Sequence, residues 1–164
     1  MRAIVVFDSR YGNTEKIARS LAAGISEAGV ETACLNSRDA KVGALKECDL
    51  VCIGAPTEAF SASKPIKEFL AKLDGADLAD KRGFAFDTKL GSRVSGSASK
   101  FIEKRLKTLG LSILAPRESA IVLSPASRDR ASATRLKEGE EQRFLQVGKM
   151  VGDSLLASAR PVPA

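Results

Sequence analysis

Six residues near the start of the chain combine hydroxyl, amide and glycine groups in a pattern that could bind an anion. They follow a short, continuous apolar run, residues 3–7, which is typical of a strand buried on both faces. Apolar residues then recur at helical spacing from Ile17 to Ala28. The loop between them therefore opens onto a helix N-terminus, where free backbone N–H groups and the positive end of the helix dipole meet. This arrangement predicts a site for a phosphate monoester, formed by Ser9, Arg10, Tyr11, Gly12, Asn13 and Thr14.

The loop differs from two common phosphate-binding motifs. It lacks the Gly-x-x-x-x-Gly-Lys-Ser/Thr pattern of nucleoside triphosphatases and the Gly-x-Gly-x-x-Gly pattern of dinucleotide-binding proteins. Taken by itself, it could also be a plain strand-to-helix turn in which Asn13 or Thr14 caps the helix. Other parts of the chain must decide between these two interpretations.

Composition excludes several kinds of chemistry. The 164-residue chain contains no histidine, which excludes Ser-His and Cys-His nucleophiles and histidine metal sites. Its three cysteines, Cys34, Cys48 and Cys52, lack the pairing of a metal site. Cys34 and Cys52 lie in strand-like runs, and we expect buried thiols there. The net charge of +6 comes from basic residues spread along the chain, so nucleic-acid binding is not indicated.

Length and hydropathy predict one domain without a membrane span. No stretch is apolar for long enough to cross a bilayer, and the first residues read directly into a strand without a signal-peptide pattern. The sequence therefore predicts a cytoplasmic protein. We expect a single domain over residues 1–157 and a flexible C-terminal tail over residues 158–164, which contains two prolines.

Strand-like and helix-like segments alternate along the chain. Five alternating pairs predict an α/β fold with a doubly wound five-stranded parallel sheet in the order 2-1-3-4-5. Residues 124–137 are predicted to form a polar surface loop. The predicted strands are 3–7, 32–35, 50–55, 83–86 and a fifth in two pieces, 113–114 and 119–123, around Pro116. The predicted helices follow the first loop and then cover 42–47, 64–73, 99–109 and a last segment from about 138 to 155.

Ligands of such sheets bind beyond the carboxyl ends of the strands, where the strand order reverses. The segments that follow the first, third and fourth strands are 9–14, 56–63 and 87–97, and all three are rich in small, polar or turn-forming residues. We expect these three loops to surround one site.

Two further motifs carry a family resemblance. Gly54-Ala55-Pro56-Thr57 ends the third strand, and Phe86-Asp87-Thr88 ends the fourth, before a loop rich in glycine and serine. Together with residues 9–14, in this order and on this strand pattern, they resemble the flavodoxin family over about residues 1–157. The chain is most similar to the short-chain members, because no long insertion splits its fifth strand, and to the flavodoxin-like modules of di-iron flavoproteins.

The resemblance implies FMN as the cofactor. Residues 9–14 would hold the FMN phosphate, and backbone amides of the other two loops would contact N5 and the pyrimidine edge of the isoalloxazine ring. On one side of the ring, the implied cofactor-binding residues are Pro56, Thr57, Glu58, Ala59 and Phe60. On the other side they are Asp87, Thr88, Lys89, Leu90 and Gly91.

The chain departs from the family pattern in two ways. Glu58 stands where the family often places an aromatic residue that stacks on the ring, and Phe60 is the candidate either to replace it or to anchor the loop. The chain is also basic, with Arg10, Lys89 and Arg93 on or beside the predicted loops. A cation near the ring favours the anionic reduced flavin, so we expect a less reducing hydroquinone couple and a redox partner with an acidic docking surface.

The first functional hypothesis is an FMN-binding electron-transfer protein, acting with a partner protein as a monomer or weak dimer. It needs no catalytic triad or metal, and the sequence offers neither. An FMN-dependent NAD(P)H:quinone or nitro-compound oxidoreductase is the second hypothesis, because residues near the ring could hold a nicotinamide phosphate. A flavin-free interaction module of the same fold is the third; Glu58 in place of an aromatic residue supports it, and the intact phosphate loop argues against it.

Overall fold

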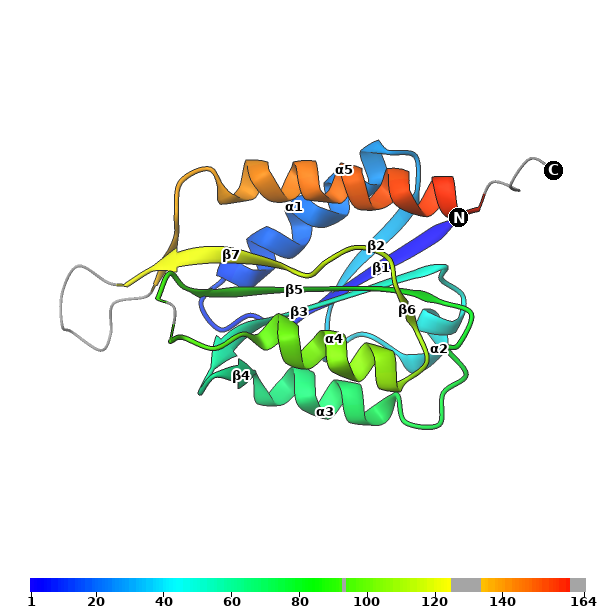
Figure 1. Cartoon of the computed structure of the whole chain (residues 1–164), viewed down its shortest axis with the longest axis horizontal. Coiled ribbons are helices and arrows are strands. Elements are labelled where there is room, and N and C mark those ends of the chain that lie inside the picture. Colours follow the sequence, from blue (N-terminus) through cyan, green and yellow to red (C-terminus); the bar gives the residue numbers. More distant parts are fainter. Residues whose placement is uncertain (93, 125–133, 160–164) are drawn as a thin grey trace.

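A computed structural model of the chain describes residues 1–92, 94–124 and 134–159. A central sheet lies between two layers of helices (Figure 1). One layer consists of α1 (Asn13–Glu27) and α5 (Glu140–Ser158), and the other of α2 (Val42–Lys46), α3 (Lys64–Lys72) and α4 (Ala98–Thr108). The predicted helices are thus present, with ends that differ by a few residues at most. No helix in the described ranges is long and apolar enough to cross a membrane.

The main strands of the sheet are parallel and follow the expected order. They correspond to the five predicted strands, and their order across the sheet is 2-1-3-4-5. The register places Val5 of the first strand between Cys34 and Cys52. From edge to edge the strands are β2 (Glu31–Asn36), β1 (Arg2–Phe7), β3 (Leu50–Glu58), β5 (Arg82–Leu90) and β7 (Glu118–Leu123).

The prediction of five wholly parallel strands was incomplete. The described residues form an eight-stranded sheet, because three two-residue strands, β4 (Ser61–Ala62), β6 (Ser112–Ile113) and β8 (Arg135–Leu136), join it. β4 and β8 are antiparallel to their neighbours. Strands this short leave no periodic signal in a sequence. β6 and β7 both pair with β5, so the fifth predicted strand is interrupted near Pro116 as expected.

Two predicted segments are only partly described. β8 lies within residues 124–137, which the sequence predicted to be a loop, and residues 125–133 of that segment lie outside the described part. α5 extends to Ser158, and residues 160–164 of the predicted tail also lie outside it. The boundary between domain and tail stays a prediction.

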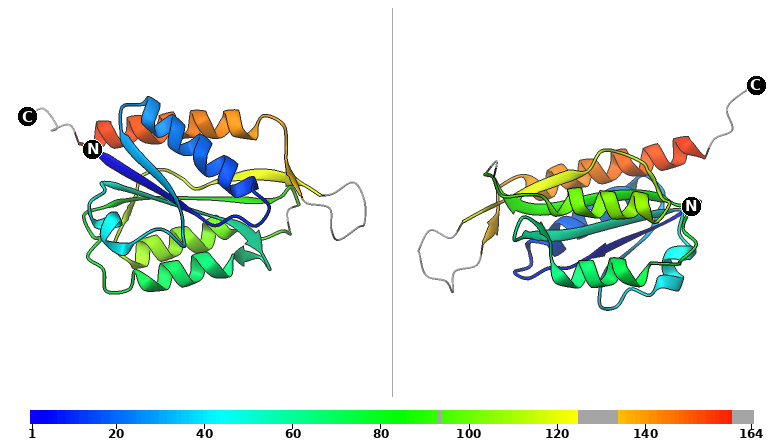
Figure 2. Two further views of the ribbon diagram at one scale, coloured as in Figure 1. Left: turned by 180° about the vertical axis from the view of Figure 1, so that it is seen from behind. Right: turned by 60° about the horizontal axis from the view of Figure 1, so that its bottom comes forward.

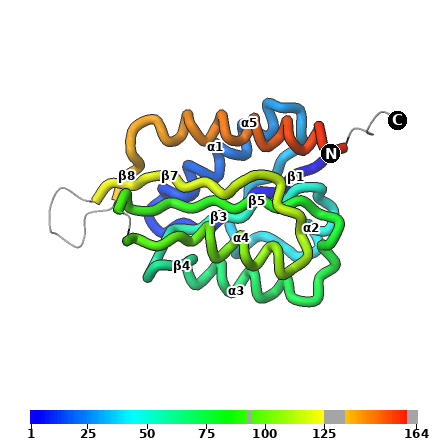
Figure 3. Tube along the Cα trace, in the orientation of Figure 1, coloured from blue at the N-terminus to red at the C-terminus, as the bar shows by residue number. Residues whose placement is uncertain are grey.

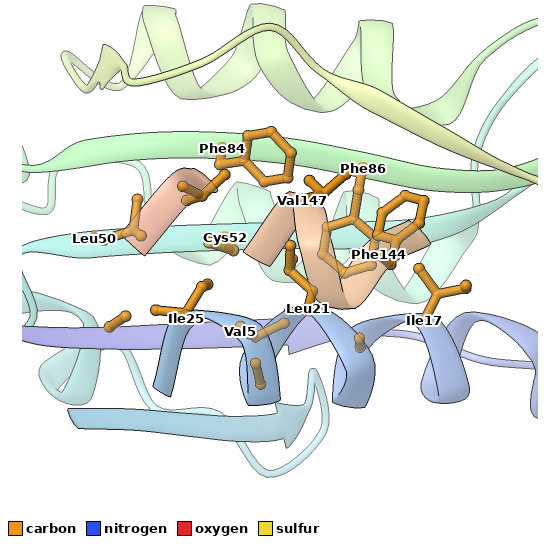
Figure 4. Packing of buried hydrophobic residues seen from close by; sticks show 14 of the residues in the cluster. Val5, Ile17, Leu21, Ile25, Leu50, Cys52, Phe84, Phe86, Phe144 and Val147 are labelled. Carbon is orange, nitrogen blue, oxygen red and sulfur yellow. The ribbon is translucent and has the colours of Figure 1, made fainter. Parts of the chain in front are cut away.

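The hydrophobic core occupies both faces of the sheet. Because side chains alternate along a strand, Val5 and Cys52 face α1 and α5, whereas Val6 and Ile53 face α3 and α4. Aromatic packing is concentrated on the α1–α5 side, as the close view in Figure 4 shows. There the rings of Phe86 and Phe144 are tilted against each other, with centroids 6.2 Å apart. This burial on both faces explains why the strand sequences are continuously apolar.

Glycines allow α1 and α5 to approach until their backbones touch. The two helices cross on one face of the sheet, as seen from behind in Figure 2. A Cβ atom added to Gly24 would lie 2.0 Å from the carbonyl oxygen of Leu145, and one added to Gly148 would lie 2.2 Å from that of Leu21. No real Cβ atom fits at such distances, so the crossing requires glycine at both positions.

Replacing Gly24 by alanine tests this packing. Alanine favours a helix intrinsically, but here it must push two backbones apart, and we expect a net loss of about 1–3 kcal/mol in the free energy of unfolding. Urea denaturation followed by circular dichroism measures the change. Gly43→Ala in α2 is the matched control, because nothing lies within 4 Å of the added methyl group. It should leave the stability unchanged or raise it, and equal stability of the two variants would contradict the close approach.

Candidate functional site

A cavity of about 180 Å³ opens beyond the carboxyl ends of β1, β3 and β5. The chain turns from β1 into α1, from β3 into β4 and out of β5 at the same end of the molecule, as the trace in Figure 3 shows. The three segments that the sequence predicted to surround one site therefore do meet. The cavity is lined by Ser9, Arg10, Tyr11, Asn13, Thr14, Pro56, Thr57, Glu58, Thr88, Lys89, Leu90, Val122 and Thr134.

The first loop is shaped by Ser9 and Gly12. Gly12 precedes α1 in the left-handed conformation, with a φ of 87°, which glycine adopts without strain. The Ser9 hydroxyl accepts hydrogen bonds from the backbone N–H groups of Gly12 (3.1 Å) and Glu15 (3.2 Å). Ser9 therefore caps α1 from outside the helix, whereas Asn13 and Thr14, the caps of the plain-turn interpretation, do not.

Several backbone donors at this helix start remain open. Within the described residues, the N–H groups of residues 11, 13 and 14 have no hydrogen-bond acceptor. They lie at the positive end of the α1 dipole, where an anion is stabilised. The geometry is therefore that of an anion site with a cavity beside it.

The side chains of Asn13 and Thr14 connect the first loop to distant strands. The Thr14 hydroxyl lies 2.8 Å from the Thr88 hydroxyl of β5, and both side chains are buried. The Asn13 amide donates to the carbonyl oxygen (2.9 Å) and hydroxyl (3.0 Å) of Thr134, just before β8. The amide of Asn13 therefore holds the cavity wall together, while the Thr14 hydroxyl retains the capacity for a second hydrogen bond.

The second segment, predicted as a loop over residues 56–63, is a tight hairpin formed by the end of β3 and by β4. β3 continues three residues past its predicted end, and Glu58 pairs with Ser61 of β4. The two turn residues, Ala59 and Phe60, have φ values of 45° and 68°. Two-residue hairpins require this left-handed backbone and usually place glycine or asparagine there, so each residue is strained by about 1–2 kcal/mol.

The third loop packs against this hairpin. Gly96 has a φ of 73°, and a Cβ atom added to it would lie 2.4 Å from the Cα atom of Phe60. Close by, the Thr57 hydroxyl accepts a hydrogen bond from the backbone N–H of Ala98, the first residue of α4 (3.1 Å). The two loops that flank the cavity are thus held to each other.

Asp87 fixes the end of the third loop from inside the sheet. Its Oδ2 atom accepts hydrogen bonds from the Ser97 hydroxyl (2.9 Å) and the Ser99 N–H (2.8 Å), at the N-terminus of α4. The side chain is fully buried, and its Oδ1 atom has no partner in the described residues. Asp87 therefore supports the loop from behind and does not line the cavity.

Charged side chains stand at the cavity mouth. Arg10 and Glu58, on opposite walls, form an ion pair with an N–O distance of 4.0 Å. The Arg10 guanidinium also lies over the ring of Tyr11, 5.4 Å from its centroid. Lys89 is half-buried and lines the wall formed by β5. Arg93, the third cation of the sequence prediction, lies outside the described residues.

The predicted site residues divide into two groups. Most of them line the cavity, but β5 runs on to Leu90, so the residues expected in the third loop are largely strand residues. Phe60 is 72% exposed and turned away from the cavity, so it does not replace the stacking aromatic. Val122 and Thr134 also line the cavity and were missed, because no motif marks them. The predicted residues that do not line it are Gly12, Ala59, Phe60, Asp87 and Gly91.

The cysteines play no part in this site. Cys48 and Cys52 are buried and Cys34 is half-buried, and all three are free thiols. Burial raises the pKa of the Cys34 thiol to about 11, so it is protonated and unreactive at neutral pH. The described residues contain no group of three or more metal-ligating side chains.

The chain belongs to the flavodoxin family, whose model matches residues 5–145. It is 32% identical over 117 residues to the flavo-diiron protein FprA2 of Clostridium acetobutylicum, covering 66% of this chain and 28% of that protein. It is 30% identical over 114 residues to a putative diflavin flavoprotein of a Synechocystis species, covering 67% of this chain and 19% of that protein. The chain thus spans less than a third of the length of these curated relatives.

Solved structures share the fold at lower identity. A flavodoxin from the domain Archaea superimposes with a TM-score of 0.78 at 23% identity, covering 95% of this chain and 99% of the other. Flavodoxin 1 from Bacillus cereus gives 0.77 at 19% identity, with coverages of 98% and 100%. The flavodiiron core of Flv1 from a Synechocystis species gives 0.74 at 21% identity, covering 96% of this chain but 36% of that one.

Replacing Gly96 by alanine tests the contact between the second and third loops. The added methyl group meets the backbone of Phe60 in a backbone conformation that already disfavours a side chain. We expect the variant to loosen the hairpin, with faster amide hydrogen exchange at residues 57–62 and a stability loss of about 1–3 kcal/mol. Gly91→Ala is the control in the same loop, because its methyl group would make only an ordinary 3.5 Å contact with Ile121. Unchanged exchange in the Gly96 variant would rule out the coupling.

Proposed function

We propose that this protein binds FMN in the cavity and exchanges electrons with a partner protein. The observation that carries the proposal is the set of open backbone donors at residues 11, 13 and 14, which adjoins a cavity between the ends of β3 and β5. Membership of the flavodoxin family supports it, because flavodoxins generally transfer electrons to partner proteins.

The first loop suits the phosphate group of FMN. A phosphate monoester is close to doubly ionised at neutral pH and presents several acceptor oxygens. Backbone N–H groups and the α1 dipole can neutralise part of this charge without burying an opposite ion. The Thr14 hydroxyl can add a donor, and Arg10 can approach from the mouth, where it is 67% exposed.

The two walls of the cavity suit an isoalloxazine ring. Residues 56–58 form one wall and residues 88–90 the other, and the coupling of the two loops fixes the distance between them. When bound, FMN would supply the redox chemistry, and the chain would orient the ring and set its electrostatic surroundings. Tyr11 is the one aromatic residue among those that line the cavity in the described structure. FMN affinity should therefore depend strongly on the phosphate contacts.

Thr14→Val tests the phosphate assignment. Valine keeps the shape of threonine but removes a hydroxyl, and hydrogen bonds to charged groups contribute about 1.5–3 kcal/mol, so the FMN dissociation constant should rise roughly tenfold or more. Quenching of FMN fluorescence on titration with apoprotein measures it. Thr108→Val is the control, because the Thr108 hydroxyl donates to the Lys104 carbonyl oxygen on the exposed side of α4. If both variants bind FMN like the wild type, the assignment of this loop fails.

Lys89→Gln tests the electrostatic influence of the cavity wall. Arg10 is paired with Glu58, so Lys89 is the cavity-lining cation without an anionic partner among the described residues. Removing this charge should destabilise the anionic hydroquinone of bound FMN by on the order of 1 kcal/mol. The one-electron potential of the step that forms the hydroquinone should therefore fall by roughly 40 mV. Potentiometric titration measures the potential, with Lys46→Gln on α2 as the control. A potential that stays the same, or rises, would contradict this role.

Two measurements separate the alternative functions. A flavin-free module would bind no FMN at micromolar concentration. An NAD(P)H-dependent oxidoreductase would be reduced rapidly by NADPH in a stopped-flow instrument without any partner protein, whereas an electron carrier would not. No contact in the described structure favours either alternative.

A further inference from the structure

The two helical layers of the molecule carry very different charge. Helices α3 and α4 contain seven basic residues and two acidic ones. Helices α1 and α5, on the opposite face of the sheet, contain four basic residues and five acidic ones. The net charge of +6 is thus concentrated on one layer, although the basic residues look evenly spread in the sequence.

Four lysines of α3 and α4 form no salt bridge with another described residue: Lys72, at the C-terminal end of α3, and three that lie close to Phe101. Lys64, Lys107 and Arg105 form ion pairs with Glu68, Glu103 and Asp74 at 3.8, 3.0 and 2.7 Å. Lys67, Lys100 and Lys104 form no salt bridge with any other described residue, and all three are exposed.

Two phenylalanines lie among these lysines. Phe60, at the tip of the β3–β4 hairpin, is 72% exposed. Phe101 on α4 is half-buried, and the Lys67 ammonium lies 5.3 Å from the centroid of its ring. A shallow cavity of about 350 Å³ between the hairpin and α4 is lined by both phenylalanines and by Lys100 and Lys104. We call Phe60, Lys67, Lys100, Phe101 and Lys104 the lysine–phenylalanine patch.

The conformation of Phe60 is itself informative. Its backbone is left-handed, a conformation in which glycine would be unstrained, and its side chain packs neither in the core nor in the main cavity. Contacts of the Phe60 ring within the folded chain therefore do not offset the strain of its backbone. Gly96 holds the hairpin so that the ring stands over α4 at the surface.

We propose that the lysine–phenylalanine patch docks an acidic redox protein that exchanges electrons with the cofactor in the main cavity. This inference rests on the proposed function. An apolar centre within a charged rim is the usual anatomy of a transient protein interface. The exposed lysines complement carboxylates of an acidic protein, and the two phenylalanines between them suit the apolar centre of a protein surface.

The hairpin connects the patch to the site. Glu58 at its base lines the main cavity, and Phe60, two residues further on, belongs to the patch. A partner seated on the patch would therefore lie against the edge of the cavity wall. The surface charge steers the partner to this edge, and its effect decreases as salt increases.

Reduced plant-type [2Fe–2S] ferredoxin is a suitable acidic probe. In a stopped-flow experiment, one electron passes from the reduced cluster to the oxidised flavin of the FMN-loaded protein, and the cluster is oxidised. The test variant is Lys100→Glu/Lys104→Glu. The control is Lys41→Glu/Lys46→Glu, which changes the net charge equally at α2, at the opposite end of the molecule from the hairpin (Figure 1).

At low ionic strength, the test variant should lose at least about tenfold in the second-order rate constant and the control less than about twofold, and the difference should disappear near roughly 0.5 M salt. Phe60→Ser should slow the reaction at high salt as well, with FMN affinity unchanged. Equal slowing of the test variant and the control would overturn the proposal, because net charge alone would then explain it. The same variant should also be tested for binding to single-stranded RNA and to anionic vesicles. If it loses that binding while its electron-transfer rate stays unchanged, the patch serves another anionic ligand and the proposal is overturned.

A flavin-free measurement keeps this test separate from the proposed function. Titration of ¹⁵N-labelled apoprotein with oxidised ferredoxin should shift the amide resonances of residues 60–61 and 98–104, and should not do so in the test variant. Shifts confined to other residues would overturn the proposal even if FMN binds. If the amides shift as expected but no FMN binds, the docking surface stands and the FMN assignment fails.

Discussion

Three parallel strands, β1, β3 and β5, end at the same edge of the sheet, and every part of the candidate site depends on this alignment. Parallel pairing aligns Phe7, Gly54 and Phe86 at one end of the molecule, although Gly54 and Phe86 follow Phe7 by 47 and 79 residues in the sequence. Helices on both faces then bury the strands, and α1 and α5 pack backbone to backbone at Gly24 and Gly148. The Ser9 hydroxyl and Gly12 shape the start of α1, where the open donors of the first loop lie.

Hydrogen bonds then connect the three loops around the cavity. The Ser9 hydroxyl shapes the first loop, and the Thr14–Thr88 contact joins it to β5. Thr57 and buried Asp87 hold the start of α4, which carries the end of the third loop. Because these contacts form within the chain itself, they position the walls before a ligand binds, which lowers the ordering cost of binding.

Two residues of the β3–β4 hairpin, Glu58 and Phe60, line two different cavities. Glu58 faces the main cavity and pairs with Arg10, which partly neutralises the charge at the mouth. Phe60 faces the opposite way, toward the lysines of α4. Gly96 packs against the backbone of Phe60, and the short antiparallel pairing of β3 with β4 closes the turn that contains the strained Ala59 and Phe60. The proposed cofactor site and the proposed docking surface are thereby neighbours on one hairpin.

The sequence by itself determined the fold class, the order of the main strands and the family, because buried strands, amphipathic helices and the Ser9–Thr14 and Gly54–Thr57 motifs are local patterns. It also placed most of the cavity-lining residues in the right segments. Tertiary structure alone decided that Phe60 faces away from the cavity, that Asp87 supports a loop from inside, and that Val122 and Thr134 complete the wall. It also decided that evenly spaced lysines gather on one layer. These features arise from contacts between distant segments, which local periodicity does not encode.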